Sequence, residues 1–551
     1  MLVSFSLSIF LSQLKPFLRI FQYLNLNDLL GSNKAIATKY KYSTMTEYMS
    51  LYHSSGTRRP AIPSLSSLAI YPMDSVGYLR RLTLLATIIT LFVSEARGID
   101  IFLEWNVSSD SNIRPVYMDQ PVITINGMFP GPLINTTTND FVHVNIFNNL
   151  DEPFLMTWNG IQQRLNSWQD GVSGTNCPIQ PGTNWTYVFQ IKDQIGSFFY
   201  FPTINFHKAA GGFGPIRVNN RNVILVPFPK PEAEFDLLIG DWYSYSFKDV
   251  RDLTDGRILS NGAAVPDFIL MNGKPPYNNP LGPTYESFNV TKGKTYRLRI
   301  SNRRIGILLS LCSWVYFLCR WNMTAGAARP NPQGTFNVTN VTISQTFVLH
   351  ASTAEINGQK RYAVNNVSYL TPDTPLKLAD QFLNGTGVYQ LDAFPTNSIN
   401  SDAAYGTSVV TGNHKGWIEI VFKNDLNVMD AWHLDGFGFY VVGFGDGDWS
   451  PDSRTSYNLF DPVVRSTVQV YPGGWSAVYA FLDNPGMWNL RSQRLPNWYM
   501  GQELYIRVFD PDPNPAKERA PPSNILYCGI IHPLTPIVIP LVPAAAPEVG
   551  R

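Results

Sequence analysis

The sequence has almost no excess charge, because 42 lysine and arginine residues balance 41 aspartate and glutamate residues to a net charge of +1. A chain without excess positive charge gives no electrostatic reason to expect nucleic acid or an anionic membrane as a partner. Helical periodicity is weak throughout. The sequence also lacks a Gly-x-Ser-x-Gly elbow, a glycine-rich phosphate loop and a His-Glu-x-x-His pair. No familiar catalytic motif of these kinds therefore points to an activity.

Short runs rich in valine, isoleucine, threonine, tyrosine and phenylalanine alternate with turn residues. Residues 141–147 and 222–227 are examples. This pattern is typical of antiparallel β-sandwich domains. The 551 residues suffice for three or four such domains, so we predict an all-β fold.

Residues 73–98 have the three-part pattern of a secretory signal. Arg80 and Arg81 precede the apolar run 82–93, and small residues follow up to Gly98. A buried strand or helix is the alternative. Because a signal that starts at residue 73 is misplaced, we predict that residues 1–72 are a spurious upstream extension produced by a wrong start choice. The apolar opening of the chain is a weaker rival signal.

Glycosylation motifs agree with this boundary, since none precedes residue 99. Nine asparagines begin Asn-x-Ser/Thr without an intervening proline: Asn106, Asn135, Asn184, Asn289, Asn322, Asn337, Asn340, Asn366 and Asn384. Their number behind a signal predicts a secreted glycoprotein.

Four segments together resemble one family. They are Thr157-Trp158-Asn159-Gly160 with Asp170-Gly171-Val172, Gly196–Thr203 with Ala210–Pro215, Asp430–Phe437 with Phe439–Gly443, and Asn484–Arg491 with Trp498–Gln502. Their order and spacing are similar to those of the multicopper oxidases, above all ascorbate oxidase and its plant homologues. These homologues include the monocopper-oxidase-like, skewed-growth-similar and pollen-specific proteins.

The resemblance covers roughly residues 99–530 and implies tandem cupredoxin-like (plastocyanin-like) β-sandwich domains, three in a full-length member. We therefore predict a first domain at 99–226, a truncated second domain at 227–320, a third domain at 321–530 and a C-terminal tail at 531–551. The resemblance also implies that Cys177 and Cys528 form the disulfide that ties the first domain to the C-terminal segment, as an oxidising compartment permits.

A blue-copper centre needs a thiolate, two imidazoles and usually a weak axial thioether. The resemblance places Ser492 at the thiolate position, Asp430 and Asn497 at the imidazole positions and Gln502 at the axial position. A serine hydroxyl is not ionised at neutral pH and is too hard a ligand for a Cu(I)/Cu(II) couple. We therefore expect that this centre does not form.

The three-copper cluster of an active oxidase takes eight imidazoles. The resemblance puts these positions on Thr157, Asn159, Phe201, Thr203, His433, Asp435, Arg491 and Gln493. Only His433 is an imidazole, and Arg491 puts a permanent cation where a metal cation should bind. The chain after residue 98 has six histidines, whereas an intact oxidase needs ten for its copper. No cofactor is expected, and copper enters by family analogy only.

Two interpretations of His433 remain open. It is a core histidine hydrogen-bonded to a neighbour such as Asp435, or a lone copper or zinc ligand assisted by Asp430 or Asp435. The core interpretation is favoured. His207, beside Lys208, is expected to be a surface or interface residue rather than a ligand.

The aspartates at 430, 435, 446 and 448 could suggest a glycosidase pair, but nothing fixes their separation. A solvated acidic loop is favoured. Four tryptophans are available to stack on sugars, although a core role is favoured for most of them: Trp158, Trp242, Trp432 and Trp498.

Residues 303–321 have neither sandwich alternation nor turn signals. The apolar part of this segment is shorter than the roughly 20 residues that cross a bilayer. About a hundred residues that the resemblance implies for the second domain are missing here. We interpret the segment as a gene-model error or an aberrant splice product, with a hydrophobic core helix as the alternative. The open strand edges that remain would favour aggregation.

The resemblance implies a secreted, catalytically silent protein of cell-wall expansion or tip growth, with a role in pollen. Its partners would be cell-wall polysaccharide or an apoplastic protein, with no nucleic acid and no transmembrane span. Prolines interrupt the apolar C-terminal stretch, so a lipid anchor is not favoured. One alternative is a residual copper-binding oxidoreductase. The other is a non-functional product of a faulty gene model, which sequencing the transcript across residues 302–321 would separate from the other two.

Overall fold

The computed structural model describes residues 98–116, 120–221, 229–256, 266–277, 284–302, 324–325, 334–397, 402–512, 514 and 516–534. Every described residue belongs to one compact unit, which lies within Leu84–Arg551. The predicted upstream extension 1–72, the predicted signal up to residue 97 and the segment 303–321 lie outside the described residues.

The first domain is a β-sandwich of two sheets, in strand order β2-β1-β4-β6 and β3-β8-β7-β5. Inward residues of β4 alternate with half-buried or exposed ones, which gives each sheet one apolar face. The strands are β1 (Asp100–Asp110), β2 (Val122–Ile125), β3 (Ile134–Thr137), β4 (Phe141–Asn148), β5 (Met156–Asn159), β6 (Asn184–Gln190), β7 (Gly196–Pro202) and β8 (Gly214–Asn219).

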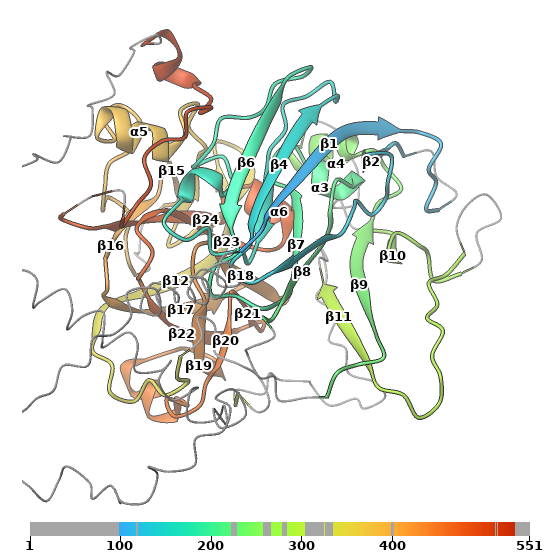
Figure 1. Cartoon of the computed structure of the whole chain (residues 1–551). Coiled ribbons are helices and arrows are strands. Elements are labelled where there is room, and N and C mark those ends of the chain that lie inside the picture. The colour runs from blue at the N-terminus through green and yellow to red at the C-terminus, as the bar shows by residue number, and fades with distance from the viewer. Residues whose placement is uncertain are drawn as a thin grey trace, which may run out of the picture. The chain divides into compact units, whose positions relative to one another are not determined.

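The next segment contributes a small sheet in the order β10-β9-β11, drawn in green in Figure 1. Its strands are β9 (Ala233–Trp242), β10 (Phe268–Met271) and β11 (Tyr296–Asn302). β11 contacts β7 of the first domain, while Leu298 is 52% exposed. Among the described residues, no strand pairs with the outer edge of β11. The sheet is thus covered less completely than the two sheets of the first domain.

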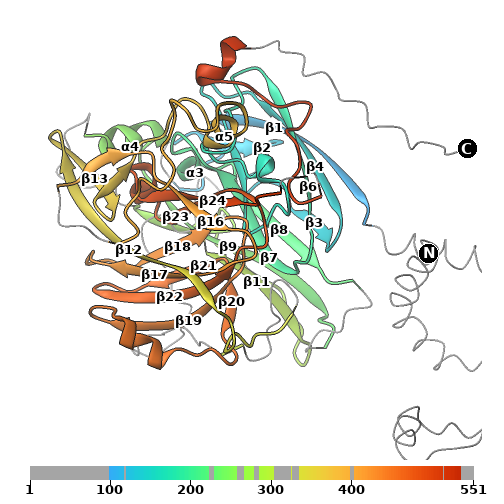
Figure 2. The same cartoon turned by 90° about the vertical axis from the view of Figure 1, so that its left-hand side faces the viewer.

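The third domain packs a large sheet, β15-β14-β13-β12-β17-β22-β19-β20, against a second one, β16-β24-β23-β18-β21. Figure 2 shows β17, β22 and β19 lying side by side. The strands are β12 (Ile343–Ile356), β13 (Gln359–Val364), β14 (Val367–Tyr369), β15 (Ala404–Gly406), β16 (Val409–Asn413), β17 (Trp417–Asn424), β18 (Asp430–Leu434), β19 (Phe439–Asp446), β20 (Val463–Arg465), β21 (Thr467–Val470), β22 (Gly474–Phe481), β23 (Gly486–Ser492) and β24 (Glu503–Phe509).

Short helices fill the connections. In α4 the Ser246 hydroxyl caps the first turn by accepting a hydrogen bond from the backbone N–H of Asp249 at 3.1 Å. The α-helices are α3 (His207–Ala210), α4 (Phe247–Thr254), α5 (Leu376–Leu383) and α6 (Leu495–Tyr499), and the 3₁₀ turns are η2 (Ser167–Gln169), η3 (Pro451–Ser456) and η4 (Gly529–Leu534). No helix among the described residues is long and apolar enough to cross a membrane.

The predicted disulfide is confirmed: Cys177 and Cys528 are bonded across 351 residues of sequence. A small apolar cluster surrounds it and includes Trp168, Leu378 and Ile531. Ile531 is buried, so the ordered C-terminal segment extends past residue 530, where the sequence placed the start of a tail.

The sequon asparagines lie at the surface. Asn366 is half-buried and Asn322 lies outside the described residues. The others are exposed: Asn106, Asn135, Asn184, Asn289, Asn337, Asn340 and Asn384. Nothing in the fold therefore blocks glycosylation at the exposed asparagines.

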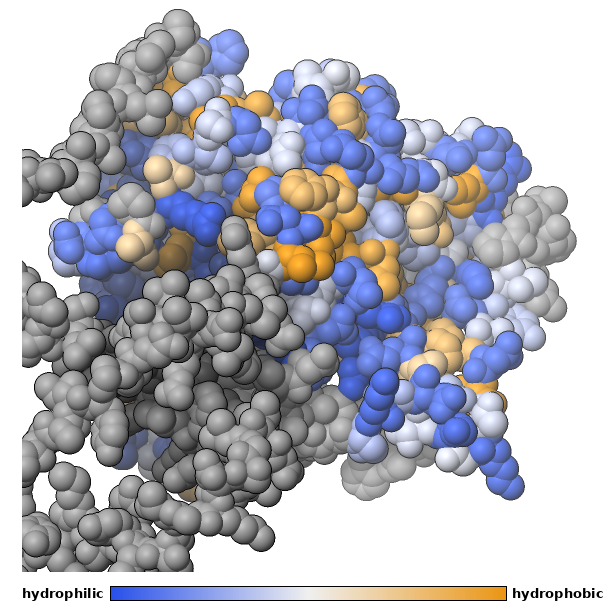
Figure 3. Space-filling view, viewed as in Figure 1, coloured by the Kyte–Doolittle hydropathy of each residue, from blue (hydrophilic) through white to orange (hydrophobic). Residues whose placement is uncertain are grey.

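Figure 3 shows one face of the molecule, mostly hydrophilic, with a hydrophobic patch near its centre.

Removal of the disulfide tests its contribution to stability. We expect Cys177→Ala/Cys528→Ala to lower the free energy of unfolding by about 2–5 kcal/mol, because the cross-link restricts a very long loop in the unfolded chain. Urea unfolding of the variant, and of the wild type with and without reductant, measures this. The reduced wild type should approach the variant. A loss below about 1 kcal/mol would contradict the expected role.

Candidate functional site

The residues singled out from the sequence meet where strands of the first and third domains end. β5 pairs with β7 so that Thr157 lies opposite Phe201. β18 pairs with β23 so that Trp432 lies opposite Ser492 and His433 opposite Arg491. Residues far apart in the sequence are thereby brought into two neighbouring clusters, both buried.

The first is the Asp430 cluster, made of Asp430, Ser492, Asn497 and Gln502. One carboxylate oxygen of Asp430 accepts hydrogen bonds from the Ser492 hydroxyl and the Ala431 backbone N–H, each at 2.7 Å. The other accepts one from the Gln502 side-chain amide at 3.2 Å. The carboxylate thus joins the side chains at three of the four positions that the sequence singled out for a blue-copper centre.

Burial dominates the titration of Asp430. It raises the pKa to about 6, although the hydrogen bond from Ser492 acts to lower it. Asn497 is also buried, and both polar atoms of its side chain lack a hydrogen-bond partner among the described residues. The side-chain oxygen of Gln502 lacks one as well. This cluster is therefore only partly satisfied.

The second is the Arg491 cluster, made of Arg491, Asp435, His433, Asn489 and Trp498. The Arg491 guanidinium forms a buried ion pair with the Asp435 carboxylate and donates to the Asn489 side-chain oxygen at 2.9 Å. Its charged carbon lies 4.6 Å from the centre of the Trp498 ring. The guanidinium is thereby fixed by contacts from three sides.

His433 completes this cluster. Its Nε2 lies 2.9 Å from Asp435 Oδ1, and its Nδ1 lies 2.7 Å from the Thr467 hydroxyl. A neutral ring can donate at one nitrogen and accept at the other, which matches these two partners. Burial lowers the pKa of His433, which favours the neutral ring. The geometry agrees with the interpretation of His433 as a hydrogen-bonded core histidine.

Two buried carboxyl groups in this region, Asp435 and Glu503, have pKa values shifted in opposite directions. Burial alone would raise the pKa of Asp435, but the charge of Arg491 and the hydrogen bond from His433 outweigh it and lower the pKa to about 2. Burial raises the pKa of Glu503 to about 7, even though Trp498 donates to it at 2.8 Å. Asp435 is thus the carboxylate that compensates Arg491.

The remaining predicted positions do not form a polar ring. The Thr203 hydroxyl donates to the carbonyl of Gly171 at 2.8 Å, and Gln493 donates to Asn159 at 3.4 Å. The Thr157 hydroxyl is buried and has no partner among the described residues. Phe201 presents its ring to a buried lysine, Lys208, whose ammonium lies 3.8 Å from the ring centre.

Sequence reasoning missed two charged groups beside these clusters. One is Lys208, named only as a neighbour of His207. The other is Asp170, whose pKa burial and the nearby Asp435 raise well above its usual range. Asp170 belongs to a segment that carried the family resemblance, and this membership could have marked it as a candidate site residue.

The surface alternative for His207 is wrong. Its side chain is 0% exposed and packs between the rings of Phe154 and Phe247, at 5.8 and 5.1 Å. Its Nε2 lies 3.4 Å from a carboxylate oxygen of Glu152. Because α3 contacts α4, His207 lies at an interface between the first domain and the segment that follows it. The interface position was the second alternative that the sequence left open for this residue.

The solvated-loop interpretation of the acidic residues holds for Asp446 and Asp448, which are exposed, and is wrong for Asp430 and Asp435, which are buried. The latter two are buried because strand pairing of β18 with β21 and β23 encloses them. The core role favoured for the tryptophans is confirmed, since all four are buried: Trp158, Trp242, Trp432 and Trp498.

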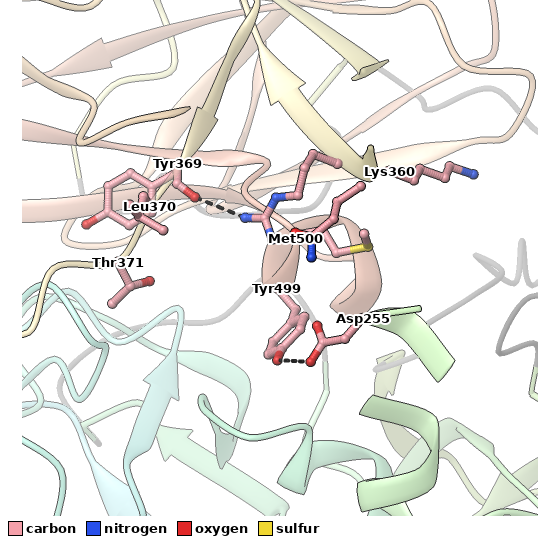
Figure 4. A pocket seen from close by; sticks show the side chains of 9 residues that line it. Asp255, Lys360, Tyr369, Leu370, Thr371, Tyr499 and Met500 are labelled. Carbon is pink, nitrogen blue, oxygen red and sulfur yellow. Dashed lines mark hydrogen bonds between the residues drawn. The ribbon is translucent and has the colours of Figure 1, made fainter. Parts of the chain in front are cut away.

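A pocket of about 340 Å³ opens at the C-terminal end of α6. Asp255 after α4, residues 359–361 at the start of β13, residues 369–371 after β14, and Tyr499 and Met500 line it. Figure 4 shows Tyr499 and Asp255 facing one another, and their hydrogen bond measures 3.2 Å. This pocket, unlike the two clusters, is open to solvent.

Comparisons with known proteins agree with this geometry. Family models described as multicopper oxidase match residues 107–223, 234–306 and 373–514. The monocopper oxidase-like protein SKU5 of Arabidopsis thaliana is 39% identical over an alignment that covers 76% of this chain and 88% of that protein. The chain belongs to the multicopper oxidase family. An L-ascorbate oxidase homologue of Brassica napus is 37% identical, with 78% of this chain and 92% of the relative covered.

Solved members of the family share the fold. A laccase from Botrytis aclada has a TM-score of 0.59 and 21% identity, covering 75% of this chain and 88% of that one. Fet3p, described as a multicopper oxidase that functions in iron import, also has a TM-score of 0.59, with 17% identity and coverages of 74% and 90%. The predicted cupredoxin-like β-sandwich fold is confirmed. The alignment with SKU5 spans 524 positions but covers only 76% of this 551-residue chain, which is fewer than 524 residues. SKU5 therefore has residues at some aligned positions where this chain has none.

The buried carboxylate of Asp430 predicts a specific pH dependence. Its folded pKa of about 6 lies above the ordinary 3.8, so the folded state holds the proton more tightly and this group stabilises the fold less as the pH rises from about 4 to 6. Asp430→Asn removes this titration. Relative to the variant, the wild type should gain about 1–3 kcal/mol of unfolding free energy between pH 7 and pH 4.

Urea unfolding of both proteins across this range measures the difference. The control Asp193→Asn changes an exposed aspartate whose left-handed backbone, with φ of 57°, also suits asparagine. Its difference from the wild type should stay flat. A flat difference for Asp430→Asn as well would show that Asp430 does not titrate as described.

The Arg491–Asp435 pair predicts a large loss when one partner is removed. Arg491→Met should lower the unfolding free energy by about 3–5 kcal/mol, because it leaves a buried carboxylate uncompensated. Arg491→Met/Asp435→Leu should recover part of this loss. Lys294→Met serves as the control, since its exposed pair with Glu232 should cost about 1 kcal/mol or less. Equal losses for Arg491→Met and the control would contradict the role assigned to the pair.

Proposed function

We propose that this chain is a secreted, glycosylated member of the multicopper oxidase family that acts in the plant cell wall by binding and performs no copper redox chemistry. The observation that carries the proposal is the buried Arg491–Asp435 ion pair. It lies at two positions that the family resemblance assigns to the three-copper cluster. A permanent cation at this place opposes the binding of a metal cation.

The residues at the blue-copper positions do not fit copper either. Asp430, Ser492, Asn497 and Gln502 supply no thiolate and no imidazole, which are the donors such a centre requires. The lone pairs of Asp430 already accept hydrogen bonds from Ser492, Ala431 and Gln502. Among the described residues, no group of three or more histidine, cysteine, aspartate or glutamate side chains is arranged to hold a metal ion.

The alternative of a residual oxidoreductase depends on His433. Both ring nitrogens of this residue already have protein partners, Thr467 and Asp435. Burial and the charge of Arg491 act together to lower the pKa of His433, which favours the neutral ring. A metal ion could bind this ring only by displacing one of its two hydrogen bonds. No specific observation favours the oxidoreductase alternative.

Secretion is supported by the Cys177–Cys528 disulfide, since such bonds persist in oxidising compartments, and by the exposed sequon asparagines. The role in wall expansion or tip growth, in pollen among other tissues, is carried over from the resemblance to plant homologues. If the protein performs no copper chemistry, binding of a ligand is the mechanism that remains for this fold. The two clusters are buried, so the ligand must bind elsewhere on the molecule.

Bound metal per polypeptide tests the proposal. Protein secreted from plant cells and expressed from Met73 onward should contain copper well below one equivalent by elemental analysis, after incubation with copper and removal of free ions. The reason is that Arg491 and Asp430 occupy the places of ligands with their own hydrogen bonds and charge.

His433→Ala serves as the matched variant. The same low copper content in wild type and variant supports the proposal. Near-stoichiometric copper in the wild type that is lost in His433→Ala would contradict it and make redox chemistry the leading function.

A further inference from the structure

The pocket at the end of α6 is built by three parts of the chain that lie far apart in the sequence: Asp255, the β13–β14 region and Tyr499–Met500. Its volume of about 340 Å³ falls within the range of small-ligand sites. Neither cluster described above lines it. It is therefore a separate candidate for the binding role.

The floor of this pocket is held by backbone hydrogen bonds. The carbonyl of Met500 accepts from the Tyr362 backbone N–H and from the Ser368 hydroxyl, each at 3.1 Å. The Gly501 carbonyl accepts from the Tyr369 backbone N–H at 2.9 Å. Gly501 has φ of +104°, and a side chain there would collide with Ser368. These hydrogen bonds fix the floor of the pocket, and a fixed floor lowers the entropic cost of binding.

One wall carries two cations, Arg361 and Lys360, for which the described residues form no ion pair, although Glu355 lies opposite Lys360 on β12. Arg361 is half-buried and donates from Nε to the Ser368 hydroxyl at 3.1 Å and from Nη2 to the Tyr369 carbonyl at 3.4 Å. Its Nη1 makes no hydrogen bond within the described part of the chain. Lys360 is exposed and forms no ion pair with any described residue. A guanidinium oriented in this way suits a carboxylate.

The opposite wall carries groups that bind hydroxyls. The Asp255 carboxylate faces the pocket and accepts from the Tyr499 hydroxyl at 3.2 Å, as Figure 4 shows. The amide of Gln359 and the hydroxyl of Thr371 lie at the exposed mouth. A simple anion would be repelled by Asp255, whereas a ligand that carries both a carboxylate and hydroxyl groups would use both walls.

We propose that this pocket binds an acidic sugar, a uronic-acid unit of a polysaccharide, with its carboxylate on Arg361 and Lys360 and its hydroxyls on Asp255. The proposal rests on the binding role proposed above and deepens it.

Calorimetric titration of the full secreted chain with a trimer of galacturonic acid tests the proposal. We expect saturable binding of one trimer per chain. The matched trimer of galactose, which lacks the carboxylates, should bind at least tenfold more weakly. Acetate at the same concentration should not compete.

Lys360→Gln, at an exposed position, should weaken binding about fivefold without affecting folding. Lys360→Gln/Arg361→Gln should abolish it, with circular dichroism to verify the fold. Lys192→Gln is the control, because it removes an exposed lysine of the first domain and should leave binding unchanged.

Three results would overturn the proposal: no binding of the acidic trimer, equal binding of the neutral trimer, or equal weakening by Lys192→Gln and Lys360→Gln. The last would mean non-specific attraction of an anionic polymer. Each result is independent of the copper measurement, so the pocket can fail while the copper-free function stands, and the reverse.

Discussion

The buried ion pair between Arg491 and Asp435 is the interaction on which the centre of this molecule depends. It joins β23 to the residue that follows β18, and β23 also contacts η2 of the first domain. Two charges removed from water are stable only when each compensates the other and the remaining donors find acceptors. Asn489 supplies one such acceptor and Trp498 covers the guanidinium, while the buried Nε has no hydrogen-bond partner among the described residues. His433 then takes its orientation from Asp435, since the carboxylate is already fixed by the arginine.

The Asp430 cluster is stabilised by other interactions than the Arg491 cluster. It contains no cation, and its carboxylate is surrounded by donors from Ser492, Ala431 and Gln502. Burial therefore dominates and the pKa of Asp430 rises, whereas the arginine lowers the pKa of Asp435. The two clusters are thus held by two different kinds of interaction, one ionic and one based on hydrogen bonds to a carboxylate that binds its proton tightly.

Much of this arrangement was predictable, and the exceptions have physical causes. Strand alternation predicted the sandwiches, because each strand buries one face, and the ligand-like motifs predicted which side chains meet. Burial of Asp430 and Asp435 was not predictable from their polarity, since their partners come from β23 and the segment after α6, some sixty residues later. For His207 the sequence left a surface and an interface position open, because a helix as short as α3 gives no periodicity from which its buried face could be read.

The segment that follows α6 links the buried interior with the open pocket. Gln502 holds Asp430 on one side, while the carbonyls of Met500 and Gly501 hold β13 and β14 on the other. Hydrogen bonds from both sides stiffen this segment, and Gly501 allows the close approach that they require. The hydrogen bonds that hold this segment also hold one wall of the pocket, so the buried Asp430 cluster and the open pocket share one structural support.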